Sequence, residues 1–233
     1  MLPPGATTRT QNGGVYHFEG MPFGMIAGNR ARTNEKGQVV YNSATGIPLQ
    51  SALMPLGRGV PPLTMGLNNN FSYKNLSFGF LIDGKFGAQV YSATNAYATQ
   101  YGLHKRTAEN GVREKGLSVS GVDQAGNPYS GTVSAQTYYS TIWATLTDQF
   151  VTDADFVKLR QVIIGYTLPK SALGRLPVQS ASISLVGRNL LLLYNAADNI
   201  DPESSYSNGN AQGLENFGLP TARSYGLNLL LRF

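Results

Sequence analysis

Apolar and polar residues alternate along residues 63–73 and again along residues 76–86. Leu63, Met65 and Leu67 belong to the apolar series of the first stretch, and threonine, glycine, asparagine and serine fill most positions between apolar ones. Successive side chains of a β-strand point to opposite faces of a sheet, so this alternation predicts strands with one apolar face. Only residues 74–75 separate the two stretches, which predicts a hairpin.

Three further strands are predicted, at residues 162–168, 181–193 and 225–233, and we expect them to be consecutive and antiparallel. Val157 and Leu159 carry the opposite phase to the strand that follows them, which predicts a β-bulge near Arg160. In the last strand one residue, Leu230, departs from the alternation. Its apolar row consists of Tyr225, Leu227, Leu229, Leu231 and Phe233.

Residues 20–30 are a weaker strand candidate. Gly20, Gly24 and Gly28 mimic the GxxxG spacing of packed membrane helices, but Pro22 and the short apolar run argue against a helix.

The connections between these strands alternate in length. Residues 74–75 and 169–180 are short links, and we expect one helical turn in the second. Loops longer than roughly 12–15 residues are uncommon in compact domains. We expect a helix at 135–147 and a small hairpin at 116–133. The long connections cover residues 31–62, 87–153 and 194–221.

Short turns that alternate with long loops, across strands of about 9–11 residues, are typical of outer-membrane β-barrels. The predicted fold class is therefore all-β: an antiparallel transmembrane β-barrel segment with long extracellular loops. In this interpretation the apolar rows face lipid and the polar rows face the lumen.

The composition agrees with strands and polar loops. Charged residues make up 13% of the 233 residues, where a soluble domain has about 25%. The net charge of +5 comes from scattered lysines and arginines, which indicates solvated loops rather than a nucleic-acid surface. There is no cysteine, so disulfides, thiol catalysis and cysteine-based metal sites are excluded within this sequence.

The sequence offers no catalytic constellation. GxSxG, P-loop, HExxH and GxGxxG motifs are all absent, so we predict no enzyme activity and no cofactor. His17 and His104 lie far apart among loop-like residues, and we expect both to be solvated. Asp198, Asp201 and Glu203 could bind calcium, but they lack the EF-hand spacing, so a proline-punctuated loop is favoured and no metal site is predicted.

Two groups of residues are candidates for binding. Asp83, Lys85 and Arg188 fall on the predicted lumen face, where they could contact substrate or a plug domain. The simpler interpretation is that lumen faces are polar in any case. The second group could stack on sugar rings, bind a lid protein, or pack the long loop on itself. Its members are Tyr138, Tyr139 and Trp143.

Several segments carry a family resemblance. These are EGMPFGMIAGN, NNNFSYKNLSFGFLIDGKFGAQVYSAT, DADFVKLRQVIIGYTLPKSAL, SISLVGRNLLLL with its Gly-Arg-Asn, and the closing segment from NIDPESS to NLLLRF. Over residues 18–233 the chain resembles the C-terminal barrel portion of a SusC/RagA-type TonB-dependent outer-membrane transporter. The resemblance implies the last strands of a barrel of about 22 strands. It also implies a plug domain, a TonB-interacting segment and an N-terminal signal, none of which this sequence contains, so residues 1–233 are expected to be one piece of a larger barrel.

The resemblance further implies a function and partners. The whole protein would take up a nutrient, an oligosaccharide or peptide, across the outer membrane of a Gram-negative bacterium. TonB would supply energy through the plug, and a SusD-like surface lipoprotein would cap the loops. The residues from Tyr225 to Phe233 resemble the assembly signal that the barrel assembly machinery reads in the last strand.

Two alternatives remain open at this point. In a soluble all-β adhesin or carbohydrate-binding module, the apolar rows would form the core of a β-sandwich. In a small autonomous outer-membrane barrel, weak strands at 15–18 and 117–133 would complete the wall.

Overall fold

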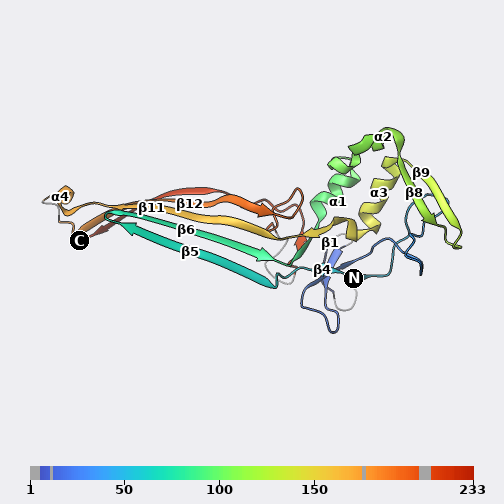
Figure 1. Cartoon of the computed structure of the whole chain (residues 1–233), viewed down its shortest axis with the longest axis horizontal. Helices are drawn as coiled ribbons and strands as arrows, with labels where there is room; N and C mark the ends of the chain where they lie inside the picture. Colours follow the sequence, from blue (N-terminus) through green and yellow to red (C-terminus); the bar gives the residue numbers. More distant parts are fainter. Residues whose placement is uncertain (1–5, 11–12, 175–176, 205–210) are drawn as a thin grey trace.

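The computed structural model describes residues 6–10, 13–174, 177–204 and 211–233. A long, narrow β-sheet extends from a smaller head that contains most of the helices (Figure 1). The C-terminus lies at the far end of the sheet, away from the head. None of the helices in the described ranges is long and apolar enough to span a membrane.

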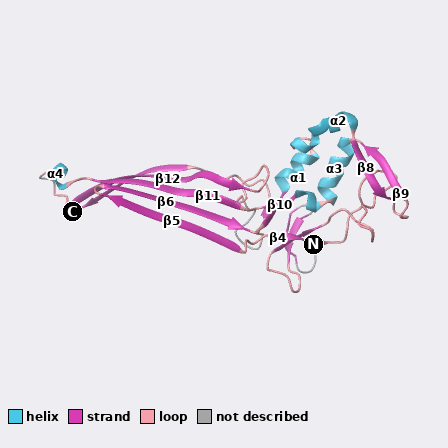
Figure 2. Ribbon diagram, in the orientation of Figure 1, coloured by secondary structure: helices cyan, strands magenta, loops and turns pink. Residues whose placement is uncertain are grey.

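The long sheet has five strands in the order β14-β12-β11-β6-β5, and every neighbouring pair is antiparallel (Figure 2). The predicted hairpin and the three consecutive antiparallel strands are both confirmed. The strands are β5 (Leu63–Tyr73), β6 (Leu76–Phe86), β11 (Phe156–Thr167), β12 (Ser180–Asn195) and β14 (Ser224–Arg232).

Strand β11 contains the predicted bulge. Its register against both β6 and β12 shifts between Leu159 and Gln161, so Arg160 is the extra residue. The bulge compensates for the change of phase in the sequence, because Leu159 and Val162 lie opposite Ile82 and Phe80, which share one face of β6. The apolar row of β11 therefore stays on one side of the sheet along its whole length.

Strand β12 is irregular at the same level. Asn189 has a φ of 51°, a left-handed conformation that asparagine tolerates better than most residues. Its Nδ2 donates a hydrogen bond to the Ala222 carbonyl oxygen at 3.1 Å, at the point where the chain returns to form β14.

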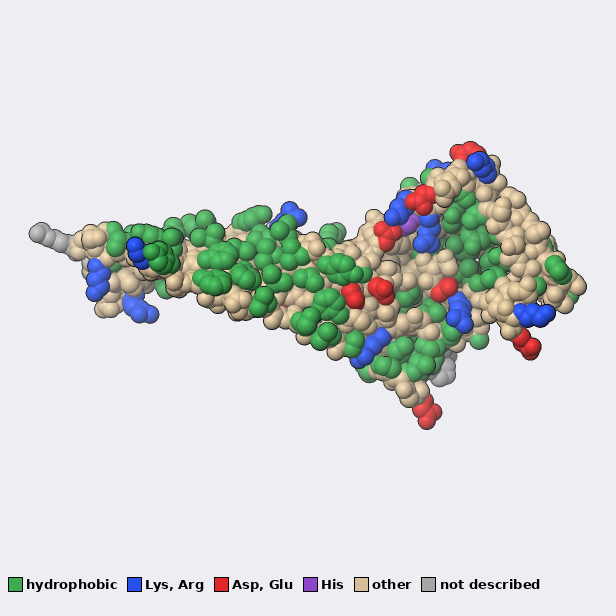
Figure 3. All heavy atoms as spheres, in the orientation of Figure 1, with side chains coloured by type: hydrophobic (Ala, Val, Ile, Leu, Met, Phe, Trp, Pro, Cys, Tyr) green, Lys and Arg blue, Asp and Glu red, His purple; other side chains and the backbone are tan. Residues whose placement is uncertain are grey.

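The two faces of the long sheet differ in chemistry, as Figure 3 shows by hydrophobic side chains gathered along the sheet. The polar face carries Asn68, Ser77, Gln161, Ser184 and Asn228 among others, with Leu81, Ile163, Val186 and Leu230 as apolar exceptions. The opposite face is apolar and exposed. Its members include Leu63, Met65, Leu67, Phe71, Tyr73, Leu76, Phe78, Ile164, Tyr166, Ile183, Leu185, Tyr225, Leu227, Leu229 and Leu231.

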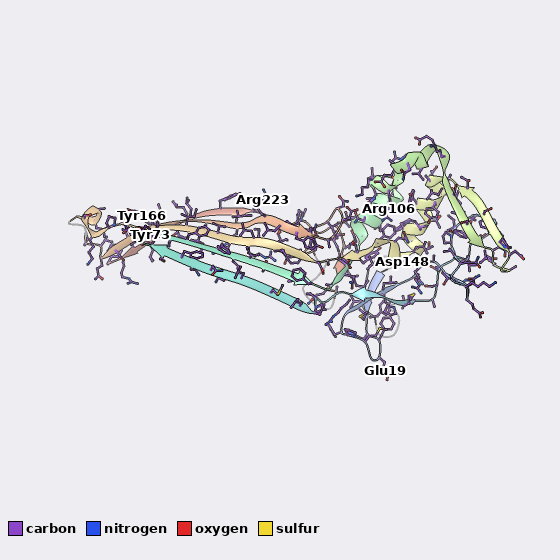
Figure 4. All side chains as sticks on the ribbon, viewed as in Figure 1. Glu19, Tyr73, Arg106, Asp148, Tyr166 and Arg223 are labelled. Carbon is purple, nitrogen blue, oxygen red and sulfur yellow. The ribbon has the colours of Figure 1, made fainter. Side chains whose placement is uncertain are left out.

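Short links join the strands at the end of the sheet away from the head. Lys74, in the turn between β5 and β6, has a φ of 52°. The link between β11 and β12 contains α4 (Lys170–Leu173), which confirms the expected helical turn. Tyr73 and Tyr166 lie at this end of the sheet, whereas Arg106 and Asp148 lie in the head (Figure 4).

The head contains α1 (Ala93–Gln100) and α3 (Ala135–Thr145) side by side, with α2 (Val112–Lys115) at one end of the pair (Figure 1). The helix expected at 135–147 and the hairpin expected at 116–133 are confirmed, whereas α1 was not predicted. The hairpin consists of β8 (Leu117–Val122) and β9 (Pro128–Val133). Three short 3₁₀ helices are η1 (Lys105–Thr107), η2 (Glu109–Gly111) and η3 (Thr147–Phe150).

The predicted antiparallel sheet is confirmed: of the residues that the structure describes, 47% are in strands and 17% in helices. Most of the helices lie in the long connection at 87–153. This connection has apolar positions of its own, such as Ala96 and Ile142, which are buried when it folds into packed helices.

Two small sheets complete the head. One has β1 (Ala6–Thr10), β2 (Gly13–Tyr16), β3 (Met25–Gly28) and β4 (Met54–Arg58) in sequence order. The other has β10 (Val151–Asp153), β7 (Gln89–Ser92) and β13 (Leu214–Glu215), in that order. The weak strand expected at 20–30 is confirmed as β3. Because β2 and the β8–β9 hairpin pair outside the long sheet, the arrangement that recruits them into one small barrel is wrong.

The core of the head draws on segments that are far apart in sequence. Val15, Ile26, Tyr91 and Leu214 are fully buried against one another, and Ala96 of α1 packs with them. This core packs the sheet that contains β2 and β3 against the sheet that contains β7 and β13. Strand β7 follows β6 in the chain, and the candidate site lies at this junction.

Candidate functional site

A network of ion pairs lies on the polar face of the long sheet, where the sheet meets the head. It joins two strands to the loop that follows β12. Its charged members are Asp83 and Lys85 of β6, Lys158 and Arg160 of β11, and Asp201 and Glu203 of the loop.

Lys158 is the centre of this network. It is only 4% exposed. Its Nζ lies 2.8 and 3.0 Å from the two carboxylate oxygens of Asp201, and 2.8 Å from Glu203 Oε2. The Thr221 hydroxyl oxygen accepts a further bond from Nζ at 3.2 Å, and Thr221 donates back to Asp201 through its backbone N–H and its hydroxyl. A lysine this deeply buried needs such partners, because an unpaired buried charge is very costly.

Arg160 forms the second half of the network. Its Nε donates to Asp83 Oδ1 at 2.6 Å and its Nη2 donates to Glu203 Oε1 at 2.5 Å. Arg160 is the extra residue of the β11 bulge, so it reaches Asp83, the cross-strand partner of Lys158. Lys85 is held more loosely, with its Nζ 3.7 Å from Glu203 Oε1 and its side chain 40% exposed.

The ring of Phe156 lies beneath these cations. Phe156 is 2% exposed, and its centroid is 5.3 Å from Lys158 Nζ, 5.7 Å from the Arg160 guanidinium carbon and 5.9 Å from Lys85 Nζ. Each of these distances is within the range of a cation–π interaction. The aromatic ring therefore adds to the fixation of the positive side chains.

The two loop carboxylates are held in the ionised form. Burial alone would raise the pKa of Asp201, but hydrogen bonds from Lys158 and from the backbone N–H groups of Glu203 and Thr221 outweigh it and lower the pKa to about 2. Burial likewise opposes ionisation of Glu203, and hydrogen bonds from Arg160 and Lys158 outweigh it and lower its pKa. Both carboxylates are therefore paired, in the ionised form, with the cationic side chains of Lys158 and Arg160.

Asp198, the third acid considered for calcium, lies apart from Asp201 and Glu203. It is close to Lys105 Nζ at 3.5 Å and His104 Nε2 at 3.8 Å. Within the described ranges no group of three or more histidine, cysteine, aspartate or glutamate side chains is arranged to hold a metal ion.

A cavity of about 290 Å³ opens beside the network, between the sheet and the head. Lys85, Phe156 and Glu203 form its wall on the sheet side, and Gln89 and Gly213 form part of its wall on the head side. The loosely held ammonium of Lys85 is thus accessible from the cavity.

The predicted lumen residues are only partly brought together. Asp83 and Lys85 both join the network, whereas Arg188 lies further along β12, opposite Gln161 of β11 and Ser224 of β14. Lys158 and Arg160 were not predicted as site residues, although Arg160 was predicted as the position of the bulge. One feature of the sequence could have indicated them: two basic residues stand in a predicted strand at the point where its apolar alternation changes phase.

The aromatic residues of α3 have different surroundings. Trp143 packs against Tyr97 with centroids 5.1 Å apart, and Tyr138 packs against a cluster that includes Tyr41. These contacts fit the interpretation that the loop packs on itself. The hydroxyl of Tyr139 donates a hydrogen bond to the Arg106 carbonyl oxygen at 2.8 Å, and Tyr139 also lines a second cavity in the head.

The expectation of two solvated histidines is wrong for His104. Its side chain is buried, and Nδ1 accepts a hydrogen bond from the backbone N–H of Arg106 at 3.2 Å, capping η1. Burial and the charge of Arg106 lower its pKa, against the opposing influence of Asp198. His17 is exposed, with its ring 4.7 Å from that of Phe23.

The connection between β12 and β14, which carries Asp201 and Glu203, is anchored to the head by Glu215. This carboxylate is 1% exposed and accepts hydrogen bonds from Ser92 Oγ at 2.8 Å, Thr94 Oγ1 at 2.6 Å and the Gly218 N–H at 3.2 Å. It lies at the first turn of α1, where a negative charge is favoured. The loop after β12 is thus fixed to the sheet at Asp201 and to the head at Glu215.

No protein-family model matches the chain. The chain is 30% identical over 188 residues to TonB-dependent receptor P26 of Formosa agariphila, and 26% identical over 199 residues to TonB-dependent receptor P3 of the same organism. Its fold is similar to that of the RagAB peptide transporter, with a TM-score of 0.58 over 99% of the chain at 17% identity. The RagAB peptide importer in its open-open state gives a TM-score of 0.59 over 95% of the chain at 16% identity. The resemblance to SusC/RagA-type TonB-dependent receptors is confirmed.

TonB-dependent receptors are outer-membrane proteins of Gram-negative bacteria, and the location expected from the sequence is confirmed at that level. Each alignment with the two curated receptors covers 76% of this chain, but the chain spans only 17% of receptor P3 and 18% of receptor P26. It spans 24% and 25% of the two RagAB chains. What the whole receptor imports and what it assembles with are therefore matters for proposal.

Proposed function

We propose that this chain forms part of the wall and outer domain of a TonB-dependent transporter that takes up an oligosaccharide or peptide. The observation that carries the proposal is the long sheet with one exposed apolar face and one polar face. Strands β5, β6 and β11 have 11, 11 and 12 residues, and a tilted strand needs about 9–11 to cross a bilayer. The apolar face contacts lipid and the polar face lines the lumen.

The exposure of the apolar face supports a lipid environment. Leu185, Leu227 and Leu229 are 60%, 63% and 64% exposed. A soluble adhesin or carbohydrate-binding module would bury these side chains under a second sheet, and the part of the chain that the structure describes provides no such cover. In water, an apolar surface of this extent would drive aggregation.

The aromatic residues at the end away from the head support the same environment. Tyr73 and Tyr166 lie there on the apolar face, 71% and 42% exposed (Figure 4). Tyrosine is enriched where a barrel wall meets the membrane–water interface, because one end of its ring is apolar and the other is polar. This end of the sheet, with its short turns, would face the periplasm.

The two free edges of the sheet support a larger barrel. Strands β5 and β14 each have one neighbour in the sheet. Unpaired N–H and C=O groups on such edges cost several kcal/mol each in lipid, so further strands must pair with them. A barrel of about 22 strands, as in large plugged transporters, would supply them.

In this arrangement the head is extracellular, because it lies at the end opposite the short turns (Figure 1). We propose it as the surface that a SusD-like lipoprotein caps, while TonB acts through a plug and the barrel assembly machinery inserts the wall. Asp83, Lys85 and Arg188 on the polar face are proposed contacts for the passing glycan or peptide, or for the plug. The chemistry proposed for these residues is binding, not bond cleavage.

Single-cysteine labelling of the whole protein tests the orientation of the wall. Leu227 and Asn228 are neighbours on opposite faces of β14, and this chain has no cysteine. In a cysteine-free background, a spin label at Leu227→Cys should be accessible to oxygen dissolved in lipid. A label at Asn228→Cys should instead respond to a water-soluble nickel reagent. Equal access of the nickel reagent to both positions would contradict a lipid-facing wall, and a label at Leu227 that neither reagent reaches would favour the buried core of a soluble module.

A further inference from the structure

A second cavity, of about 400 Å³, lies in the head between the end of α1, helix α2 and the start of α3. Figure 2 shows these three helices grouped in the head, away from the long sheet. The site network described above does not include this cavity. Its wall includes Thr99, Gln100, Tyr101, Arg113, Gln136 and Tyr139.

Among the residues that the structure describes, Arg113 is the one charged residue that lines the cavity. Its Nε donates to the Thr107 carbonyl oxygen at 2.9 Å and its Nη2 donates to the Gly102 carbonyl oxygen at 2.6 Å. These acceptors are neutral, and no carboxylate pairs with Arg113 among the described residues. Its Nη1 has no partner there either, so the guanidinium is fixed in place with one nitrogen free and its charge uncompensated. Such a group suits a carboxylate.

Two polar atoms in the cavity wall residues lack partners. Thr99 is fully buried, and neither its Oγ1 nor the buried Oε1 of Gln100 has a hydrogen-bond partner. Buried polar atoms are usually satisfied, so exceptions of this kind need an explanation. Both atoms are buried from solvent, so they lie behind the cavity surface and are not contacts for a bound ligand.

The remaining wall is aromatic. Tyr101 is 69% exposed, and its ring stacks on that of Tyr97 with centroids 6.4 Å apart at an interplanar angle of 23°. Tyr139 is held by its hydroxyl bond to Arg106. Two positioned rings beside a few polar groups are typical of sites for small ligands.

We propose that this cavity binds a carboxylate-bearing ligand, with the carboxylate on Arg113 and the rest of the ligand against the rings of Tyr101 and Tyr139. The inference rests on the proposed function, since it names the substrate class that the head would recognise. Two sources share this chemistry: a uronic acid unit of an oligosaccharide or an acidic residue of a peptide.

Calorimetry on the purified whole protein in detergent tests the proposal. The acidic probes are trigalacturonate and an acetylated, amidated tripeptide that contains glutamate. Their uncharged counterparts are maltotriose and the same tripeptide with glutamine. At least one acidic probe should bind about 10-fold or more tightly than its counterpart, and added salt should weaken it, because exposed charges are screened. The acidic probe that binds identifies whether the carboxylate comes from an oligosaccharide or from a peptide. If neither acidic probe is preferred over its counterpart, the proposal is wrong.

Variants locate the binding. Arg113→Gln should reduce affinity for the acidic probe about 10-fold or more. Because Arg113 also holds the Gly102 and Thr107 carbonyl groups, Gln136→Glu provides a second route, placing a negative charge on an exposed wall residue and leaving those bonds intact. Gln136→Glu should reduce the affinity for the acidic probe to the same extent. Lys115→Gln, on the same helix but outside the cavity wall, is the matched control and should change little.

The two proposals fail separately. If Arg113→Gln and Gln136→Glu both bind the acidic probe like the unmodified protein, this inference is wrong even when Leu227→Cys shows access to lipid. If the label at Leu227→Cys is accessible only to the water-soluble reagent, the proposal that the sheet is a lipid-facing transporter wall is wrong, whatever the cavity binds.

Discussion

Lys158 and Asp201 form a two-oxygen ion pair, at 2.8 and 3.0 Å, across 43 residues of sequence. Both side chains are buried, at 5% and 9% exposure. The pair ties the bulged strand β11 to the loop that follows β12, and Glu215 ties the same loop to the first turn of α1. The loop is therefore a strap between the sheet and the head. Its two anchors, Asp201 and Glu215, fix the position of the head relative to the polar face of the sheet.

Asp201→Asn should release this strap from the sheet. Loss of one partner from a buried ion pair costs about 3–5 kcal/mol, and we expect the lower end because Glu203 still pairs with Lys158. Urea unfolding of the whole protein in vesicles would measure the loss, and protease cleavage within residues 196–223 should increase. Asp198→Asn is the control, since the Asp198 side chain is 53% exposed and surface pairs contribute little. Equal effects of the two substitutions would contradict a special role for Asp201.

Acidification should loosen the head before it loosens the strap. The pKa of His104 is lowered from 6.5, so the folded head binds its proton less readily than the unfolded chain does, and stability falls as the pH drops below 6.5. The pKa of Asp201 is lowered from 3.8 to about 2, so its contribution is complete above 3.8 and is lost as the pH falls through 2.

Hydrogen exchange of the whole protein, corrected for intrinsic rates, would resolve the two steps. Protection around η1 should decrease as the pH falls below 6.5, while residues 196–204 stay protected until the pH falls below 3.8. His104→Asn keeps a capping acceptor without an ionisable ring, so it should abolish the first step. A simultaneous loss of protection in both regions would contradict the assignment.

Leu229 and Leu230 provide a test of the two faces with one chemical change. They are 64% and 65% exposed and adjacent in β14, but Leu229 pairs with Ile183 on the apolar face and Leu230 with Ser182 on the polar face. Leu229→Arg should cost about 2–4 kcal/mol if it lies near the bilayer midplane, whereas Leu230→Arg in a wet lumen should cost little. Urea unfolding of both variants in vesicles gives the comparison. Similar costs would rule out lipid on one face only.

The long sheet was predictable because its signal is local. Alternation with period two appears within each strand, and the phase change between Leu159 and Val162 is enough to predict the bulge at Arg160. The same alternation placed Asp83 and Lys85 on the polar face.

The contacts of the site were not predictable in the same way. Which loop carboxylate meets Lys158 depends on how the chain returns from β12, and that return has no periodic pattern. Glu215 was missed because a carboxylate that caps a helix from 121 residues away leaves no local mark in the sequence. Helix α1 was missed because its residues, such as Thr94 and Asn95, are poor helix formers and its apolar side chains are small.

The proposed assembly signal consists of Tyr225, Leu227, Leu229, Leu231 and Phe233. Phe233 directly follows β14, is 73% exposed, and lies at the end of the sheet away from the head. A charge near the membrane interface costs only about 0–1 kcal/mol, so simple transfer energy predicts a small effect of Phe233→Asp. Recognition by the assembly machinery predicts instead a large loss of inserted protein, with unchanged substrate affinity in the fraction that does insert. Heat-modifiable gel mobility of purified outer membranes would report the inserted amount. If Phe233→Asp inserts at the unmodified level while Leu229→Arg does not, Phe233 is only a lipid contact.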